Sequence, residues 1–223
     1  MGFFFAMLLI LGFVALLAWS VHFTRKQEKK RREIFSAFAQ ENDYQFTAEH
    51  DPSILQQYQH FSLFQGGRHK KATNSLKRTL EDSFIHAFHY SVTNGSGKNS
   101  HTYIHTCIHI TGQQSAFPHF LLRHESAFLD SLGKIFGGQD INFPSDAVFS
   151  DSFVLQGNDA DKTRYFFSSQ QIRNAFMIYK GTGASIEGNG DSLLISYWQL
   201  VPEKFPLEME NALLLHNSIQ PNA

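Results

Sequence analysis

Residues 82–111 read DSFIHAFHYSVTNGSGKNSHTYIHTCIHIT, and this stretch decides the fold. Two runs rich in aromatic and β-branched residues, 82–92 and 101–111, flank a centre of Asn, Gly, Ser and Lys. Runs of this kind on either side of turn residues are typical of an antiparallel β-hairpin. The sequence therefore predicts a sheet built around this hairpin.

The second run has two distinct faces, because successive residues of a strand point in opposite directions. One face carries Thr102, Ile104, Thr106, Ile108 and Ile110, and the other carries His101, Tyr103, His105, Cys107 and His109. A turn centred between Ser96 and Gly97 would place His86 opposite Cys107, with His105 and His109 as its diagonal neighbours.

Imidazole and thiolate groups are ligands that zinc and softer metals prefer. The candidate metal ligands on this hairpin are His86, His105, Cys107 and His109. The alternative, which we favour, is a half-buried aromatic face on which histidine serves as a polar aromatic residue. On that interpretation the chain has no metal site.

Further helices and strands are predicted before and after the hairpin in the sequence. Asp51 before a proline predicts a short helix over 52–58, since Asp caps helices and Pro fits their first turn. A second hairpin is predicted over 184–198, with its turn at Asn189-Gly190. The remaining predicted elements are strands at 73–80 and 117–123 and helices at 128–136, 172–179 and 202–219. Antiparallel hairpins combined with packed helices indicate an α+β fold.

The first 23 residues differ sharply from the rest of the chain. All 19 basic and 20 acidic residues lie after Phe23. Only Gly12 and Ser20 interrupt the apolar run over 3–21. At about 1.5 Å per residue this run spans about 30 Å, the thickness of a bilayer's hydrocarbon core. Residues 1–24 are therefore predicted to form one transmembrane helix. A cleaved signal peptide is the alternative, but no basic residue precedes the run.

A strongly basic segment follows the apolar run. Its basic side chains are Arg25, Lys26, Lys29, Lys30, Arg31 and Arg32. Positive charge beside a membrane helix stays on the cytoplasmic side, so the N-terminus is expected outside and residues 25–223 in the cytoplasm. The protein is thus expected to cross the inner membrane once. The six basic side chains are expected to face the lipid surface, where each contributes about 1 kcal/mol of attraction to anionic headgroups.

Residues 25–42 are predicted to form a basic juxtamembrane helix, and residues 43–223 one cytoplasmic α+β domain. The helical spacing is carried by Ile34, Phe35, Phe38 and Ala39. Beyond residue 33 the chain has 13 basic and 18 acidic residues, so no nucleic-acid partner is expected. A second group of basic residues lies within the domain, at Arg68, Lys70, Lys71, Lys77 and Arg78. This group is either a surface for lipid headgroups or a solvated loop.

Three segments of the chain partly match known cofactor-binding or metal-binding motifs, but each lacks residues that its motif requires. Gly181-Thr182-Gly183 begins like a dinucleotide-binding turn, but Ile186 replaces the third glycine and a hairpin follows. Gly95-Ser96-Gly97-Lys98 lacks the leading glycine of a phosphate loop. Asp159-Ala160-Asp161 lacks the glycine and glutamate of a calcium loop, and one of its aspartates is expected to cap a helix. No catalytic residue and no cofactor is therefore assigned.

Several different short motifs are spread over residues 61–153. They are Phe61-Ser62-Leu63-Phe64, Asn74-x-Leu76, Phe88-x-Tyr90, Ser96-Gly97-Lys98, Leu132-Gly133 and Asp140-Ile141-x-Phe143-x-Ser145, followed by Phe149 and Phe153. In these motifs the chain resembles a family of bacterial single-pass membrane proteins with a domain of unknown function. The resemblance implies an anchored domain and transfers no catalytic residue.

Together these observations favour a non-enzymatic, membrane-anchored cytoplasmic domain that binds a partner or acts as a scaffold at the inner membrane. The sequence does not identify a protein partner. The alternative is a metal-dependent enzyme that uses the His/Cys cluster on the hairpin face. A third hypothesis is a sensor of the lipid surface that uses the basic group within the domain.

Overall fold

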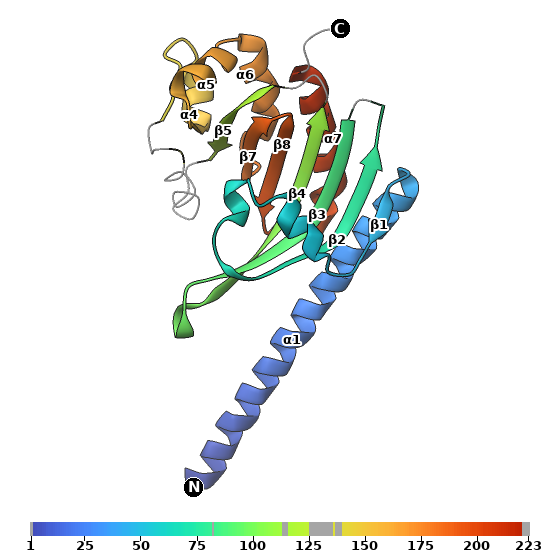
Figure 1. The fold of residues 1–223 in the computed structure, drawn as a ribbon. Coiled ribbons are helices and arrows are strands. Elements are labelled where there is room, and N and C mark those ends of the chain that lie inside the picture. The colour runs from blue at the N-terminus through green and yellow to red at the C-terminus, as the bar shows by residue number, and fades with distance from the viewer. Residues whose placement is uncertain (1, 82, 113–115, 125–135, 137–139, 220–223) are drawn as a thin grey trace.

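The computed structural model describes residues 2–81, 83–112, 116–124, 136 and 140–219, without the side chains of residues 2–6, 8–10 and 17. An eight-stranded sheet forms its centre, with the strand order β1-β2-β3-β4-β8-β7-β5-β6. Every pair of neighbouring strands in this sheet is antiparallel. The helices pack on this sheet (Figure 1), which confirms the predicted α+β class.

The strands are β1 (Gln45–Thr47), β2 (Arg68–Thr79), β3 (Ser83–Asn94), β4 (His101–Gly112), β5 (Phe117–Arg123), β6 (Val154–Gly157), β7 (Ala184–Gly190) and β8 (Ser192–Trp198). The α-helices are α1 (Gly2–Glu41), α2 (Pro52–Gln57), α4 (Ala147–Ser152), α5 (Ala160–Phe166), α6 (Gln170–Phe176) and α7 (Phe205–Ile219). Short 3-10 turns are η1 (Ser62–Phe64), η2 (Gly97–Asn99), η4 (Met177–Tyr179) and η5 (Pro202–Lys204).

Most predicted elements are confirmed, with shifted ends. The strand predicted at 73–80 begins earlier, at Arg68. The turn predicted at Asn189-Gly190 lies one residue later, because Asn189 still pairs with Ser192 across the hairpin. Asp51 caps α2 through the amide of Ser53, as predicted. Asp159 likewise caps α5. The helix predicted at 128–136 lies outside the described residues except for its last position.

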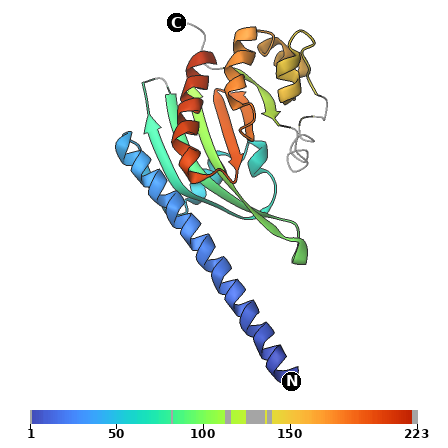
Figure 2. The same cartoon turned by 180° about the vertical axis from the view of Figure 1, so that it is seen from behind.

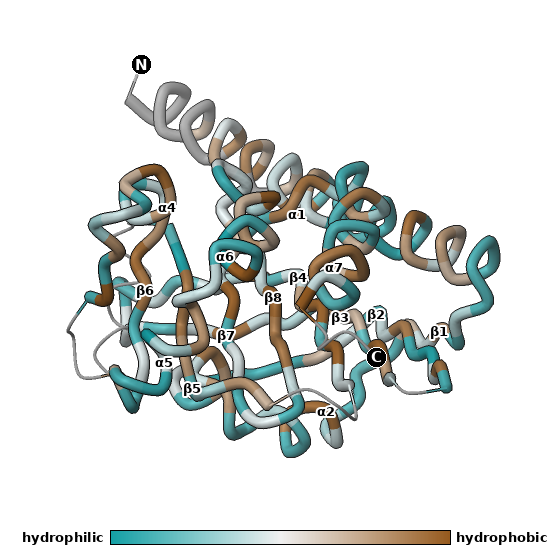
Figure 3. The backbone as a smooth tube through the Cα atoms, turned by 90° about the horizontal axis from the view of Figure 1, so that it is seen from above, coloured by the Kyte–Doolittle hydropathy of each residue, from teal (hydrophilic) through white to brown (hydrophobic). Residues whose placement is uncertain are grey.

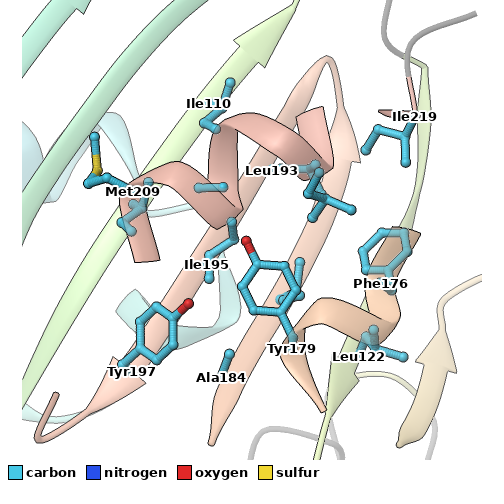
Figure 4. Packing of buried hydrophobic residues seen from close by; sticks show 14 of the residues in the cluster. Ile110, Leu122, Phe176, Tyr179, Ala184, Leu193, Ile195, Tyr197, Met209 and Ile219 are labelled. Carbon is cyan, nitrogen blue, oxygen red and sulfur yellow. The ribbon is translucent and has the colours of Figure 1, made fainter. Parts of the chain in front are cut away.

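One face of the sheet, here called the core face, carries the larger hydrophobic cluster. Its side chains on the central hairpin are Ile85, Ala87, Ile108 and Ile110. Figure 3 shows α1, α6 and α7 on this side of the sheet and α2 on the other. Rings supply much of the packing, and Figure 4 shows Phe176, Tyr179 and Tyr197 among the aliphatic side chains of β4, β8 and α7. The abundance of phenylalanine in the sequence thus accounts for the core, since each ring buries a large area.

The second half of α1 belongs to the domain. Phe35 is buried and stacks on Phe205 of α7, with 3.8 Å between ring centroids. Ala39, one turn further on, is also buried. The first half of α1 extends away from the sheet (Figures 1 and 2). Within the side chains that the structure describes, no helix offers an apolar stretch long enough to cross a membrane.

The packing of the core can be tested at Gly188 of β7. A Cβ at this position would collide with the ring of Phe120, which is fully buried among other aromatic rings. Gly188→Ala is therefore expected to lower the free energy of unfolding by about 1–3 kcal/mol, the usual cost of overpacking. Gly66→Ala is the matched control, because a Cβ there meets open space. Urea unfolding of both variants checks this, and equal midpoints would contradict the packing of Phe120.

Candidate functional site

The other face of the sheet, here called the histidine face, carries the residues that the sequence singled out. His86, Phe88 and Tyr90 of β3 lie on it, opposite His109, Cys107 and His105 of β4 respectively. The predicted register, with His86 opposite Cys107, is therefore wrong by two residues. The cause is the loop, in which the turn η2 moves the centre of the hairpin to between Gly97 and Lys98. A shift of two residues preserves the face, because side chains alternate with a period of two.

Tyr58, at the end of α2, joins two of these histidines. Its hydroxyl lies 2.6 Å from Nδ1 of His86 and 3.3 Å from Nδ1 of His109. Nε2 of His86 lies 2.8 Å from Oγ of Ser75. Two assignments of protons satisfy every contact, and in both of them Tyr58 donates to one histidine and accepts from the other. The short helix α2 is thereby fixed onto the sheet by a polar network inside an aromatic cluster.

The electrostatics of this network disfavour charged forms. Burial, and then the positive charge of Lys77, lowers the pKa of His86 to about 3. Burial, and then His60, lowers the pKa of His109 to about 3. Burial also lowers the pKa of His105 to about 4 and raises the pKa of the Cys107 thiol. The imidazoles are therefore neutral and the thiol is protonated at neutral pH, so Cys107 lacks the thiolate that a nucleophile needs.

The metal hypothesis gains no geometric support from these positions. His86 and His109 face each other and share Tyr58, whereas Cys107 faces Phe88 and His105 faces Tyr90. In the part of the chain that the structure describes, no three His, Cys, Asp or Glu side chains are grouped to hold a metal ion. The face that we expected to be half-buried is fully buried, because the segment from α2 to η1 covers it.

A buried carboxylate that sequence reasoning missed extends the histidine face. Glu187 of β7 is 3% exposed and accepts hydrogen bonds from the backbone amide and the hydroxyl of Ser62, the latter at 2.5 Å. Nε2 of His119 lies 2.9 Å from the same carboxylate. Glu187 occurs in an ordinary strand pattern, so only its burial reveals it. Together with Tyr58 it holds the α2–η1 segment against the sheet.

A cleft lies on the core face, between α1 and the strands β2, β3 and β4. Its volume is about 470 Å³. We call it the basic cleft, and its lining side chains are Arg25, Glu28, Lys29, Arg31, Arg32, Ala48, Lys71, Thr73, Asn74, His89, Ser91 and Ile104. Four of the six basic residues predicted to face lipid therefore line it, whereas Lys26 and Lys30 do not. The cleft opens where the sheet-facing side of α1 changes from Phe35 to Arg31, one turn closer to the N-terminus.

The basic group predicted within the domain is divided by the structure. Four of its side chains are used internally: Arg68 donates to the carbonyl of Gly95, Lys70 to that of Phe64 and Arg78 to that of Asn42, and Lys77 lies 3.8 Å from Asp51. The fifth, Lys71, lines the basic cleft. The five residues therefore do not form one surface, and only Lys71 joins the basic residues of α1.

The floor of the basic cleft contains an irregular stretch of β2. The register to β3 slips by one residue between Thr73 and Leu76, which makes a β-bulge. Asn74 in this bulge has a φ of 52°, a conformation that asparagine tolerates better than most residues. Its side-chain amide lies 3.2 Å from Nδ1 of His89. Burial, and then the charge of Arg31, lowers the pKa of His89 to about 3, so its ring is neutral.

Comparisons with known proteins add evidence on the fold. No protein-family model matches the chain, and no curated protein matches it. A similar solved structure is the crystal structure of the mycobacterial trehalose monomycolate transport factor A, TtfA. The two share 8% identity and a TM-score of 0.54 over 89% of this chain and 98% of that chain. At this identity the likeness concerns the fold alone.

Proposed function

We propose that this chain is a membrane-anchored domain that acts by binding, without catalysis, at the cytoplasmic face of the inner membrane. The observation that supports this proposal is that the two halves of α1 differ. The first half exposes apolar side chains, whereas the second half begins with basic side chains and packs against the domain. Large apolar side chains are exposed all along the first half: Met7, Leu11, Phe13, Val14, Leu16, Trp19, Val21 and Phe23. Such a surface is unfavourable in water and is covered in a bilayer.

The basic half of α1 supports the orientation. Six of the side chains between residues 25 and 32 are basic, and positive charge beside a membrane helix is retained on the cytoplasmic side. The basic cleft begins at Arg25, directly after the apolar segment of α1. In an anchored protein this cleft would therefore lie at the lipid surface. The similar protein TtfA is named as a transport factor, which is a role other than catalysis. A role without catalysis is also consistent with a sequence that matches no catalytic motif.

Cysteine labelling of the full chain in bacterial cells tests the topology. Cys107 is fully buried, so the unaltered protein serves as the unlabelled control. Ser96→Cys, at the exposed end of the β3–β4 hairpin, is expected to react with a membrane-impermeant maleimide only after the cells are permeabilised. Gly2→Cys is expected to react in intact cells. Labelling of Ser96→Cys in intact cells, or release of the protein by alkaline carbonate, would refute the proposal.

A further inference from the structure

The basic cleft holds more positive charge than the domain neutralises. Arg32 is paired with Glu49 at 3.0 Å, and Lys29 lies 3.7 Å from Glu33. Three other basic side chains of the cleft make no ion pair or hydrogen bond with any residue that the structure describes: Arg25, Arg31 and Lys71. The side chain of Arg31 is only partly exposed. Glu28, which also lines the cleft, is the acidic neighbour of Arg31. The five basic side chains of the cleft thus have three carboxylates near them, those of Glu28, Glu33 and Glu49. A bound anion would offset the positive charge that remains.

The floor of the cleft adds neutral hydrogen-bond donors. Asn74 donates to Nδ1 of His89, so the single proton of the neutral imidazole lies on Nε2. No described residue accepts a hydrogen bond from that nitrogen, nor from the hydroxyls of Thr73 and Ser91, which also line the cleft. The bulge at Asn74 thus helps to orient His89 beneath the positive charge of Arg31.

We propose that the basic cleft binds a phosphate group, either in the headgroup of an anionic lipid or in a soluble phosphate ester. Charged donors around a tetrahedral oxyanion form the stronger class of hydrogen bonds, and Arg matches phosphate in geometry. Arg31 and Lys71, which come from α1 and β2, would contact the phosphate from two sides. His89, Thr73 and Ser91 would donate from the floor.

The position of the cleft favours the lipid as the source, and for this step we rely on the proposed membrane anchoring. Residues 25–32 of α1 cover about 10 Å of helix axis. Each headgroup layer of a bilayer is about 5–8 Å thick, and this layer begins where the apolar run ends at Phe23. The tip of the β3–β4 hairpin also projects toward the N-terminal side of the molecule (Figures 1 and 2). A headgroup beside α1 would therefore lie at the depth of the cleft.

Calorimetric titration of glycerol phosphate into the full chain in phosphatidylcholine nanodiscs tests this binding. The double variant Arg31→Gln with Lys71→Gln is expected to bind at least about tenfold more weakly, since two charged donors to the phosphate are lost. The matched control is Lys180→Gln with Lys204→Gln, which removes the same charge from exposed positions outside the cleft. That control is expected to change the affinity by less than about twofold, because exposed charges are screened.

Nanodiscs that contain phosphatidylglycerol identify the source of the phosphate. With a lipid occupant, hydrogen exchange over residues 71–74 slows when phosphatidylglycerol is added, and glycerol phosphate binds more weakly by competition. With a soluble ligand, phosphatidylglycerol leaves both measurements unchanged, and glycerol phosphate alone slows the exchange. The inference is overturned if neither probe binds, or if the control variant loses as much affinity as the cleft variant. If the cysteine labelling contradicts the proposed topology, a lipid headgroup is excluded as the source of the phosphate, but binding of a soluble phosphate ester is not.

Discussion

The folded domain is expected to unfold as the pH falls from 6.5 to about 4.5, mostly above the range in which carboxylates are neutralised. The cause is a set of histidines of which none is more than 5% exposed: His86, His89, His105 and His109. Burial is the main reason that their pKa values are lowered, to about 4 for His105 and to about 3 for the other three. In the unfolded chain the same groups titrate at about 6.5.

The direction of the effect follows from which state binds the protons. Between pH 6.5 and about 4 the unfolded chain binds a proton at each imidazole, whereas the folded chain does not, so the free energy of unfolding falls with the pH. Above pH 6.5 both states are neutral and this stability is fully present. Each group contributes about 1.4 kcal/mol per pH unit, and the four together about 5 kcal/mol per unit. A domain stable by about 5–15 kcal/mol loses that stability within about one to three units.

Urea unfolding of the full chain in detergent, repeated from about pH 7.5 to about pH 4, measures this slope. His89→Gln is expected to lower the slope by about 1.4 kcal/mol per pH unit, because one titrating group is lost. His101→Gln, at the exposed start of β4, is the control and should leave the slope unchanged. A stability that stays constant down to about pH 4 would contradict the burial of these histidines.

Local patterns in the sequence predicted most of the elements of the fold but not β1, α4 or β6, and they did not predict the register of the central hairpin. The hairpin followed from two alternating runs, and the caps at Asp51 and Asp159 followed from the chemistry of helix ends. The register depended on the turn at residues 97–99, which no pattern signalled. Since that shift equals the period of a strand, the histidine face was assigned to the correct residues with the wrong partners.

The candidate sites depend on contacts between residues far apart in the chain, which a single sequence does not reveal. Lys71 was grouped with Arg68 and Lys77 because they are neighbours in sequence, whereas the structure brings it beside Arg31. Ser62 and Glu187 are separated by 125 positions, and neither residue type signals the other. For Glu187 the missing information was its burial, because charged side chains are expected to be exposed. For Lys71 it was the position of α1 beside β2.

Replacement of Glu187 by alanine is expected to lower the free energy of unfolding by about 3–5 kcal/mol. The carboxylate is the acceptor for the backbone amide and the hydroxyl of Ser62, and it lies within hydrogen-bond distance of His119. Without it, buried donors lose their partner, and each unsatisfied group costs about 1–3 kcal/mol. Urea unfolding of the full chain measures the loss. Glu49→Ala is the control, since Glu49 is an exposed partner of Arg32 and such pairs contribute about 1 kcal/mol or less.

Hydrogen exchange separates a local effect of this substitution from a general one. Glu187 and Tyr58 hold the α2–η1 segment at two points, so the loss of one leaves the segment attached through the other. In Glu187→Ala the amides of Ser62, Leu63 and Phe64 are expected to exchange faster than in the unaltered protein, while those of β4 at the centre of the sheet stay protected. Glu187→Gln keeps an acceptor for the Ser62 amide and should show a smaller change. Unaltered exchange at Ser62 in the alanine variant would show that other contacts hold η1 in place.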